Sequence, residues 1–359
     1  MTSVAKKRYV LLTGAAGKVG QYLVSVLLSA GYYVIATDVA PVKTRRGLDE
    51  DNYAYIRCDL TNHKDIQALI LGAKPDVLVH TAAIVAPISY AVPEQARLVN
   101  LEASLCLLKA LEKANSNAHF IFCSSYSVHG PKSPYTDSSM WTSETPLKPS
   151  DAYAQQKALF ERVLTSSRLR WSILRLGSIM DAAMIVPKHY SYKPFAYMVP
   201  LEQREHGVDV MDVVTAVVNC VGLDKSNQIY MIGGDTSWMK TAREFRTAVY
   251  ASMGLPNLLE QSFRQPPVPN LDEGWYCENW MDTARSQAIL NYQHHRFDDF
   301  VRRLRRNNLL KRYLYPLIKK TIYTKMLCKS PYWGPNAIVP GRTLKEDLEY
   351  VFSPRVENC

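Results

Sequence analysis

The turn after the first short apolar run constrains the fold of this chain more than any other feature. Residues 9–12 read Tyr-Val-Leu-Leu, and glycines then recur at every third position before a stretch with apolar residues at helical spacing. A strand, a tight glycine turn and a helix in this order form the first unit of a dinucleotide-binding sheet, in which the bare backbone and the helix N-terminus approach a pyrophosphate. A tight turn that binds nothing is the alternative. The residues expected at the pyrophosphate are Gly14, Ala16, Gly17, Lys18, Val19 and Gly20.

Short apolar runs and amphipathic stretches alternate through the first half of the chain. The runs are continuously apolar, which is typical of strands covered by helices on both faces. Strands that alternate with helices form parallel β-α-β units. We therefore expect an α/β protein with a Rossmann-type doubly wound parallel sheet and a smaller C-terminal substrate-binding region. The expected strands are residues 9–12, 33–36, 53–56, 77–80, 119–123 and 171–174, and the expected helices are residues 19–30, 62–71, 94–113 and 152–166.

The regular alternation ends after Gly177. A helix at 211–221 and a strand at 228–232 are expected to return to the sheet. The prolines in 181–206 and 254–269 indicate irregular segments, the first of them a loop or lid. The expected parts of the chain are a dinucleotide-binding domain at 1–177 with a returning segment at about 207–233, a substrate-binding region at 178–206 and 234–300, and a basic C-terminal extension at 301–359.

The composition is that of an ordinary globular protein. Of 359 residues, 47% are apolar and 21% are charged, and no apolar run approaches the roughly 18 residues of a membrane span. The seven cysteines are odd in number and form no C-x-x-C pair, which argues against a disulfide framework or a zinc site. The N-terminal residues lack the apolar segment of a secretory signal. We expect a cytoplasmic protein with free thiols and no metal.

The positive charge is concentrated in one segment. Between Val301 and Ser330 there are ten Lys or Arg and no Asp or Glu, and since the formal net charge is +10, the rest of the chain is neutral. No nucleic-acid partner is expected, because no recognised nucleic-acid motif accompanies this segment. Apolar residues recur in it at roughly helical spacing, and Pro316 should kink or split the helix. These apolar residues are Leu304, Leu310, Leu314, Leu317, Ile318 and Ile322.

Two kinds of contact suit this basic extension. The simpler interpretation is that its apolar side packs on the protein itself or on a second subunit. The alternative is peripheral contact of residues 301–330 with an anionic membrane surface, which would place a cytoplasmic protein at a membrane.

Asp38 follows the second expected strand, 18 residues after Gly20. A carboxylate at this place accepts hydrogen bonds from the adenosine ribose and repels a 2′-phosphate, which favours NAD as the cofactor over NADP. Lys43, Arg45 and Arg46 lie just beyond and could hold a phosphate, although a solvated basic loop explains them more simply.

Tyr153 and Lys157 are four residues apart on an expected helix and therefore share a face. A neighbouring ammonium favours the phenolate and lowers the pKa of a tyrosine from about 10 towards neutrality, so that the phenol can exchange a proton with a substrate oxygen. A Tyr-Lys pair on a solvated helix face is the alternative.

Taken together, these motifs resemble those of the extended short-chain dehydrogenases/reductases, the NAD-dependent epimerase/dehydratase family. The resemblance covers about residues 7–300. The T-G-x-x-G-x-x-G loop matches at residues 13–20 and the Y-x-x-x-K pair at residues 153–157. Residues 123–130, Cys-Ser-Ser-Tyr-Ser-Val-His-Gly, resemble the family's S-S-x-x-V-Y-G.

The resemblance implies a catalytic triad, a set of cofactor-binding residues and a homodimer. Ser125 would be the catalytic hydroxyl, and Tyr153 and Lys157 would complete the triad. Further residues that follow the strands would line the cofactor. The cofactor residues implied in this way are Asp59, Leu60, Thr81, Ala82, Ala83, Asn100, Cys123, Tyr153 and Lys157.

Two departures from the family's pattern narrow the substrate. Dehydratases carry Asp-Glu after the catalytic hydroxyl residue, whereas this chain has Tyr126 and Ser127, so dehydration is not expected. Sugar-nucleotide enzymes usually show R-x-x-N-x-Y-G-P after the sixth strand, whereas residues 175–178 read Arg-Leu-Gly-Ser and lack that asparagine. We therefore expect a substrate other than a nucleotide sugar. The residues expected to contact it are Val85, Tyr126, Gly177, Ser178 and Met180.

Three functions are open, and the first is the one that we expect. It is an NAD-dependent oxidoreductase that interconverts a secondary alcohol and a ketone by hydride transfer, with a small carbonyl or alcohol compound as its partner. The alternative is an NAD-dependent nucleotide-sugar epimerase, which uses the same triad to oxidise and then re-reduce one substrate. The second alternative is a non-catalytic NAD-binding scaffold, which the intact Ser-Tyr-Lys set disfavours.

Overall fold

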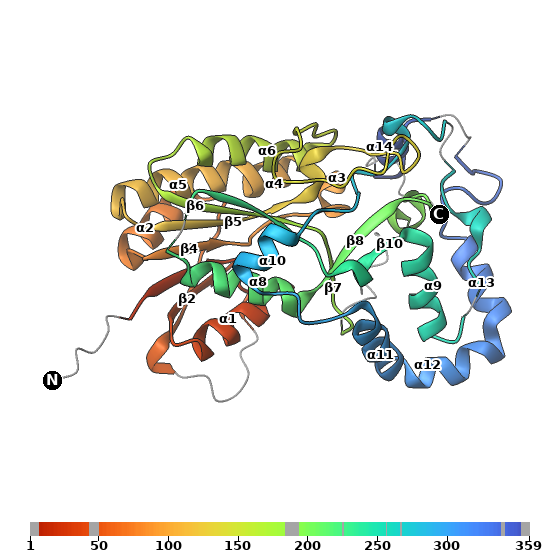
Figure 1. Cartoon of the computed structure of the whole chain (residues 1–359), viewed down its shortest axis with the longest axis horizontal. Helices are drawn as coiled ribbons and strands as arrows, with labels where there is room; N and C mark the ends of the chain where they lie inside the picture. Colours follow the sequence, from red (N-terminus) through yellow and green to blue (C-terminus); the bar gives the residue numbers. More distant parts are fainter. Residues whose placement is uncertain are drawn as a thin grey trace.

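A seven-stranded parallel sheet forms the centre of the computed structural model, in the order β3-β2-β1-β4-β5-β6-β9 (Figure 1). The structure describes residues 7–42, 50–183, 194–224, 226–255, 257–265, 268–338 and 342–352. All seven strands expected from the sequence are present, and the predicted doubly wound fold is confirmed. The strands are β1 Tyr9–Thr13, β2 Tyr33–Asp38, β3 Tyr53–Arg57, β4 Val77–His80, β5 His119–Ser125, β6 Arg170–Leu176 and β9 Gln228–Ile232.

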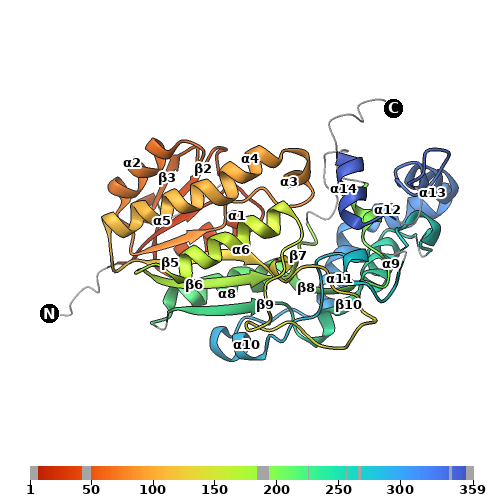
Figure 2. The ribbon, with the colours of Figure 1, turned by 90° about the horizontal axis from the view of Figure 1, so that it is seen from above.

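Helices cover both faces of this sheet (Figures 1 and 2). On one face lie α1 Gly20–Ser29 and α8 Val210–Gly222, and their apolar side chains join those of the strands in one core. The opposite face carries a second core, covered by α2 His63–Ala73, α5 Ala103–Ala114 and α6 Ala152–Thr165. Because both faces of the central strands are buried, these strands have continuous apolar runs.

Local signals explain where several helices begin and end. Gly31 has a φ of +87° directly after α1, a conformation that favours glycine. The Asn62 side chain accepts a hydrogen bond from the Lys64 amide at the start of α2. The single helix expected at 94–113 is divided into three parts: α4 Pro93–Arg97, a π-helical turn Leu98–Glu102, and α5.

A second sheet of three strands lies beyond the end of β6, in the order β10-β8-β7. Its strands are β7 Ser178–Met180, β8 Arg204–Asp209 and β10 Met239–Thr241. The prediction of an irregular segment at 181–206 is therefore partly wrong, because it contains the start of β8 and the short helix α7 Phe195–Met198, while residues 184–193 lie outside the described ones. The buried face of β8 includes polar residues such as His206, so no apolar pattern indicated a strand.

The C-terminal part forms the outer end of the molecule (Figure 1). Pro316 lies in the short 3-10 turn Tyr315–Ile318 that separates α12 from α13, as its ring predicts. The last helix returns to the α3 and α7 region, where the Arg264 guanidinium donates to Asp347 at 2.9 Å in a buried ion pair. The helices of this part are α9 Ala242–Ser252, α11 Phe297–Asn307, α12 Leu309–Leu314, α13 Lys319–Leu327 and α14 Leu344–Phe352. Two further helices are α3 Ile88–Ala91, which contacts α14, and α10 Ala284–Leu290, which packs on α8 and β9.

Within residues 301–330 the fully buried apolar side chains of the basic extension lie in α11, and nearer the C-terminus Leu344 and Leu348 are buried as well. In α11, Phe300 and Leu304 are fully buried against Trp238. Leu310 and Leu317, which were expected to pack in the same way, are 77% and 80% exposed. For these residues the simpler interpretation of packing within the chain is wrong. No helix among the described residues is long and apolar enough to cross a membrane.

Candidate active site

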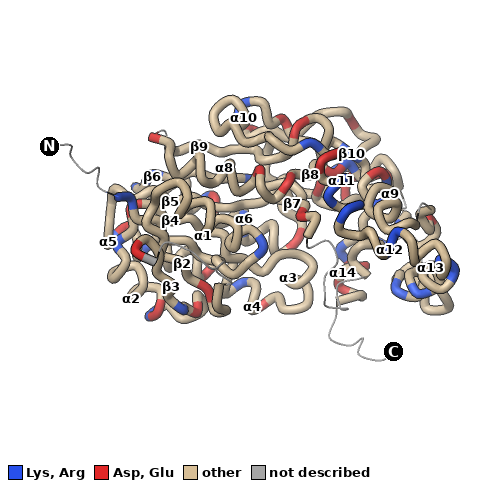
Figure 3. The backbone as a smooth tube through the Cα atoms, turned by 90° about the horizontal axis from the view of Figure 1, so that it is seen from below, with Lys and Arg blue, Asp and Glu red and all other residues tan. Residues whose placement is uncertain are grey.

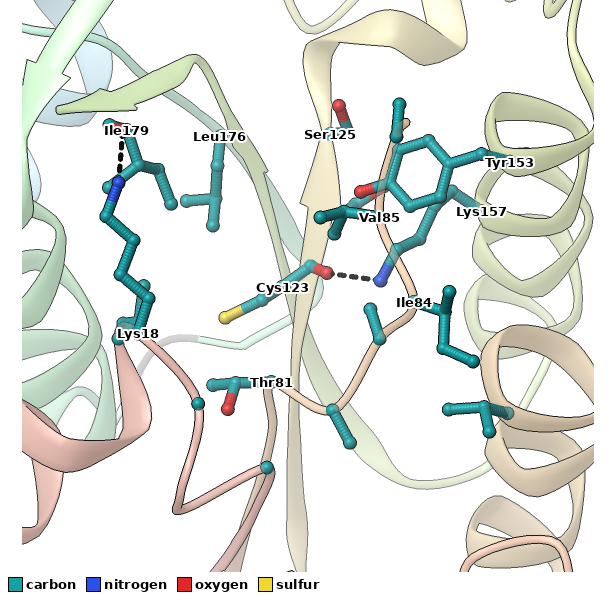
Figure 4. A pocket seen from close by; sticks show the side chains of 18 of the residues that line it. Lys18, Thr81, Ile84, Val85, Cys123, Ser125, Tyr153, Lys157, Leu176 and Ile179 are labelled. Carbon is teal, nitrogen blue, oxygen red and sulfur yellow. Dashed lines mark hydrogen bonds between the residues drawn. The ribbon is translucent and has the colours of Figure 1, made fainter. Parts of the chain in front are cut away.

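A cavity of about 760 Å³ opens at the carboxyl ends of the central strands (Figure 4). In a doubly wound sheet this crevice is where ligands bind. Its walls come from the sheet and from residues 276–278, far along the chain. The predicted site residues that line it are Gly14, Gly17, Lys18, Val19, Gly20, Asp38, Asp59, Leu60, Thr81, Ala82, Ala83, Val85, Cys123, Ser125, Tyr126, Tyr153, Lys157, Gly177 and Ser178.

Three predicted residues lie outside this lining. The Ala16 amide donates to the Asp38 carboxylate at 3.0 Å and so orients that side chain. Asn100 is buried behind the wall, where its amide group bonds both the N–H and the C=O of Ile84. Met180 packs against the apolar cluster of the C-terminal part instead of facing the cavity.

Two positions in the turn between β1 and α1 require glycine. Gly14 has a φ of +72°, and a Cβ atom there would lie 2.6 Å from the Ala82 amide nitrogen. A Cβ atom at Gly20 would lie 2.1 Å from the Gly14 carbonyl oxygen. No side chain caps the start of α1. The amides of Gln21, Tyr22 and Leu23 donate to the carbonyl oxygens of Gly17 and Val19, which leaves the amides just before them to meet a ligand in the cavity. This backbone geometry fits a pyrophosphate.

Two carboxylates line the same end of the cavity. Asp38 accepts hydrogen bonds from the Ala16 and Ala40 amides, at 3.0 and 3.1 Å, and retains acceptor capacity for the hydroxyls of a ribose. Asp59 accepts from the amide and the hydroxyl of Thr61, and these bonds lower the pKa of its carboxyl. The residues present therefore fit the adenosine half of NAD. The alternative phosphate ligands, Lys43, Arg45 and Arg46, lie outside the described residues.

The fold brings the three predicted catalytic residues together. Ser125 ends β5, and Tyr153 and Lys157 lie in the first half of α6. Ser125 and Tyr153 both line the cavity, and Ser125 acts to lower the pKa of the Tyr153 phenol. The Lys157 ammonium nitrogen lies 5.9 Å from the centre of the Tyr153 ring and donates to the Cys123 carbonyl oxygen at 2.8 Å (Figure 4).

The acidity predicted for Tyr153 is not found in the protein alone. Removal from water raises the pKa of Tyr153 above that of a free tyrosine, and the neighbouring Ser125 offsets only part of this rise. Lys157 is 1% exposed, and burial lowers the pKa of its ammonium to about 8, with Cys123 and Glu161 opposing the shift. The prediction that Lys157 makes this phenol acidic is therefore wrong for this state, because burial acts on both groups more strongly than they act on each other.

A carboxyl group that the sequence analysis missed faces the cavity. Glu278 accepts a hydrogen bond from the Ser178 hydroxyl at 3.2 Å, and the Ser178 hydroxyl also lies 2.8 Å from that of Tyr126. Burial and then the neighbouring Glu205 raise the pKa of Glu278 to about 8. Residues 276–278 belong to no recognised motif, and an acidic residue within an aromatic stretch was the only signal in the sequence.

The described residues hold no metal centre: no group of three or more His, Cys, Asp and Glu side chains among them is arranged to bind a metal ion. The site is therefore one of glycine backbone, hydroxyls, carboxyls and amines.

Comparison with known proteins agrees with this geometry. A UDP-glucose 4-epimerase of Mycolicibacterium smegmatis is 25% identical over 305 residues, which are 79% of this chain and 92% of that protein. A D-erythronate dehydrogenase of Cupriavidus necator is 29% identical over 184 residues, and the match spans 47% of this chain and 55% of that protein. The crystal structure of the Thermus thermophilus UDP-glucose 4-epimerase in complex with NAD has the same fold, with a TM-score of 0.65 and 24% identity over 84% of this chain and 98% of that one.

The family assignment comes from a match to a family model. Residues 10–233 match the family described as the NAD dependent epimerase/dehydratase family, and this match covers more than half of the chain. The description agrees with the cofactor expected from Asp38. The protein belongs to the NAD dependent epimerase/dehydratase family.

Proposed function

We propose that this protein is an NAD-dependent enzyme that moves a hydride to or from a secondary alcohol or ketone carbon of its substrate. The observation that carries the proposal is that Ser125, Tyr153 and Lys157 line the same cavity as the glycine turn. NAD, when bound, accepts or returns the hydride.

Ser125 and Tyr153 act on the substrate oxygen. With a ketone, the Ser125 hydroxyl donates a hydrogen bond to the carbonyl oxygen and the Tyr153 phenol delivers a proton to it. Because the pKa of Tyr153 is raised, the phenol is protonated at neutral pH and ready for this direction. Oxidation of an alcohol needs the phenolate, which the positive charge of Lys157 favours at a pH below its pKa of about 8. Lys157 would also bind the nicotinamide ribose.

Substitution of Tyr153 tests these roles. We expect Tyr153→Phe to lower turnover by about 100-fold or more, since a positioned general acid contributes about that factor. NAD binding should be retained, because the glycine turn and Asp38 are untouched. The matched control is Tyr135→Phe, which removes a hydroxyl from an exposed tyrosine outside the cavity. Equal turnover of Tyr153→Phe and the parent protein would contradict the proposal.

The relatives favour the epimerase over the net oxidoreductase that we expected from the sequence. The UDP-glucose 4-epimerase matches over 92% of its own length, whereas the D-erythronate dehydrogenase matches over 55% of its length. In an epimerase Tyr153 would act twice, as the base for oxidation and then as the acid for reduction, with no net release of NADH. A nucleotide-sugar epimerase is therefore the first candidate reaction.

The charges of the cavity favour a second candidate, a net oxidoreductase acting on an uncharged hydroxy compound. Among the described residues that line the cavity, only Lys18 and Lys157 are basic, and each donates to a backbone carbonyl oxygen. Glu278 adds an acidic group. The glycine turn would hold the pyrophosphate of NAD, so the diphosphate of a nucleotide sugar would need Arg or Lys side chains elsewhere in the lining, which offers few of them.

The nicotinamide absorbance and the identity of the product separate the two candidates. UDP-glucose and a panel of uncharged polyols and hydroxy compounds would be supplied with NAD. An epimerase inverts one carbon of the sugar without accumulating NADH, whereas an oxidoreductase forms NADH and ketone in equal amounts. NAD binding with no turnover of any compound would support the scaffold instead.

A further inference from the structure

Residues 309–318 present a ridge of large apolar side chains to solvent. We name it the apolar ridge, and it comprises Leu309, Leu310, Tyr313, Leu314, Leu317 and Ile318. Leu310 and Leu317 are the most exposed of them, at 77% and 80%. No other stretch of ten described residues gathers as many large exposed apolar side chains. Such a contiguous patch marks an interaction site.

Four residues of the apolar ridge share one side of α12, since Leu309 and Tyr313 are four apart and so are Leu310 and Leu314. Leu317 and Ile318 continue the ridge in the 3-10 turn that follows. Upstream in α11, Phe300 and Leu304 are buried in the protein. After Asn308 the large apolar side chains therefore face solvent instead of the core of the protein.

The cations around the ridge are largely unpaired. Arg302 and Arg303 form ion pairs with Asp299 and Asp209. Most of the other basic residues of this region are exposed. Figure 3 shows Lys and Arg positions along α12 and α13 at the outer edge of the molecule. Those that form no ion pair with any described residue are Arg305, Arg306, Arg312, Lys319, Lys320 and Lys325.

We propose that the apolar ridge and these cations dock the protein on an anionic lipid bilayer. Leucine side chains enter the boundary between headgroups and acyl chains, and Lys and Arg at the flanks attract the lipid phosphates. Tyr313 suits the same boundary, since its ring is apolar and its hydroxyl polar. The position of α12 and α13 at one end of the molecule leaves the ridge accessible to a flat surface (Figures 1 and 2).

Charge argues against a second copy of the chain as the occupant. In a two-fold symmetric dimer the same patch meets itself, so the cations beside the two ridges would approach one another. The segment supplies no Asp or Glu between residues 301 and 330 to compensate them. An anionic surface satisfies both the apolar and the charged part of the patch.

Vesicle flotation with the full-length protein tests this proposal. Vesicles of phosphatidylcholine alone are compared with vesicles of equal amounts of phosphatidylcholine and phosphatidylglycerol. We expect binding to the anionic vesicles only, and weaker binding as the salt concentration rises. Leu310→Ser with Leu317→Ser should reduce binding by about tenfold or more, because these side chains would no longer enter the lipid. Leu71→Ser with Leu271→Ser, at two exposed leucines elsewhere, is the matched control.

A charge variant keeps the test independent of the leucines. Removal of three cations in Arg312→Gln with Lys319→Gln and Lys320→Gln should lower the partition coefficient by about 100-fold, since each charge near an anionic surface contributes about 1 kcal/mol. The matched control removes the exposed lysines of α2 and α5, in Lys64→Gln with Lys109→Gln and Lys113→Gln. Thermal unfolding checks that every variant is folded.

Two results would overturn the proposal. One is the absence of flotation with anionic vesicles, or flotation that neither the leucine nor the charge variant reduces. The other is a dimer in light scattering that Leu310→Ser with Leu317→Ser dissociates while vesicle binding is absent, which would assign the ridge to a second copy of the chain.

Discussion

Glu278 is a carboxyl group held among hydroxyls at the wall of the cavity. Its raised pKa of about 8 means that much of it is protonated at neutral pH, so it can donate a hydrogen bond as well as accept one. With Ser178 and Tyr126 it forms a chain of hydroxyl and carboxyl groups beside the candidate catalytic residues. Such a chain suits a substrate with several hydroxyls, which are both donors and acceptors.

The same pKa predicts how Glu278 affects stability. A carboxyl whose pKa is raised by folding contributes its full stability below its unfolded pKa, and this contribution is lost as the pH rises through the folded value of about 8. We therefore expect the parent protein to lose roughly 3 kcal/mol between about pH 5 and about pH 8 relative to Glu278→Gln. Urea unfolding at several pH values measures this difference. Glu144→Gln, at an exposed carboxyl, is the control, and parallel pH profiles of Glu278→Gln and the parent would refute the prediction.

At the level of single residues, the sequence predicted which residues form the site better than it predicted their pKa values. Tyr153 and Lys157 could be paired because their spacing is local, and Ser125 could be added by resemblance. Glu278 could not be predicted as a site residue, because its loop reaches the cavity only through tertiary packing. The raised pKa of Tyr153 could not be predicted either, because desolvation depends on the atoms that surround the ring in the folded protein and not on the neighbouring residues in the sequence.

One buried ion pair joins two elements that shape the site. The Arg175 guanidinium of β6 forms a fork with the Glu161 carboxylate of α6, at 2.8 and 3.2 Å to one oxygen, and both side chains are almost fully buried. The Ser124 hydroxyl donates to the same carboxylate at 2.5 Å. Glu161 therefore fixes α6, which carries Tyr153, relative to the end of β5.

Removal of this carboxylate should cost much of the stability of the fold. We expect Glu161→Ala to lower the free energy of unfolding by about 3 to 5 kcal/mol, because it leaves a buried guanidinium without its counter-ion. Denaturant unfolding measures the loss. The comparison is Glu349→Ala, which breaks an exposed pair with Lys345 and should have little effect. A similar small effect of both substitutions would show that Arg175 does not depend on Glu161.

At the level of elements, strands with apolar faces could be predicted and strands with polar faces could not. All seven strands of the central sheet could be predicted from apolar runs bounded by turns, because strands that are buried on both faces have an apolar composition. β8 escaped detection because its buried residues include Glu205 and His206, which find partners only in the folded protein. The π-helical turn before α5 likewise has no signature in helical spacing.

The whole molecule has two parts, with the cavity between the sheet and a segment of the C-terminal part. NAD bound there should raise the thermal unfolding temperature by several degrees when it is in large excess over its dissociation constant. NADP should raise it less, because Asp38 repels a 2′-phosphate. Asp38→Asn should reduce the difference between the temperature shifts caused by NAD and by NADP. Fluorescence-monitored melting of the parent protein and of the variant with each dinucleotide measures this difference. An equal shift by NADP and NAD in the parent protein would contradict the proposed role of Asp38.

The fate of a deuterium label tests the central proposal most directly. The protein is mixed with NAD and with UDP-glucose or uncharged alcohols that carry deuterium at the reacting carbon, and both the product and the nicotinamide are analysed by mass spectrometry. We predict that a net oxidation leaves the deuterium on the nicotinamide, that an epimerisation returns it to the inverted carbon, and that Tyr153→Phe suppresses both outcomes. Loss of the deuterium to the solvent during conversion would contradict hydride transfer at this site.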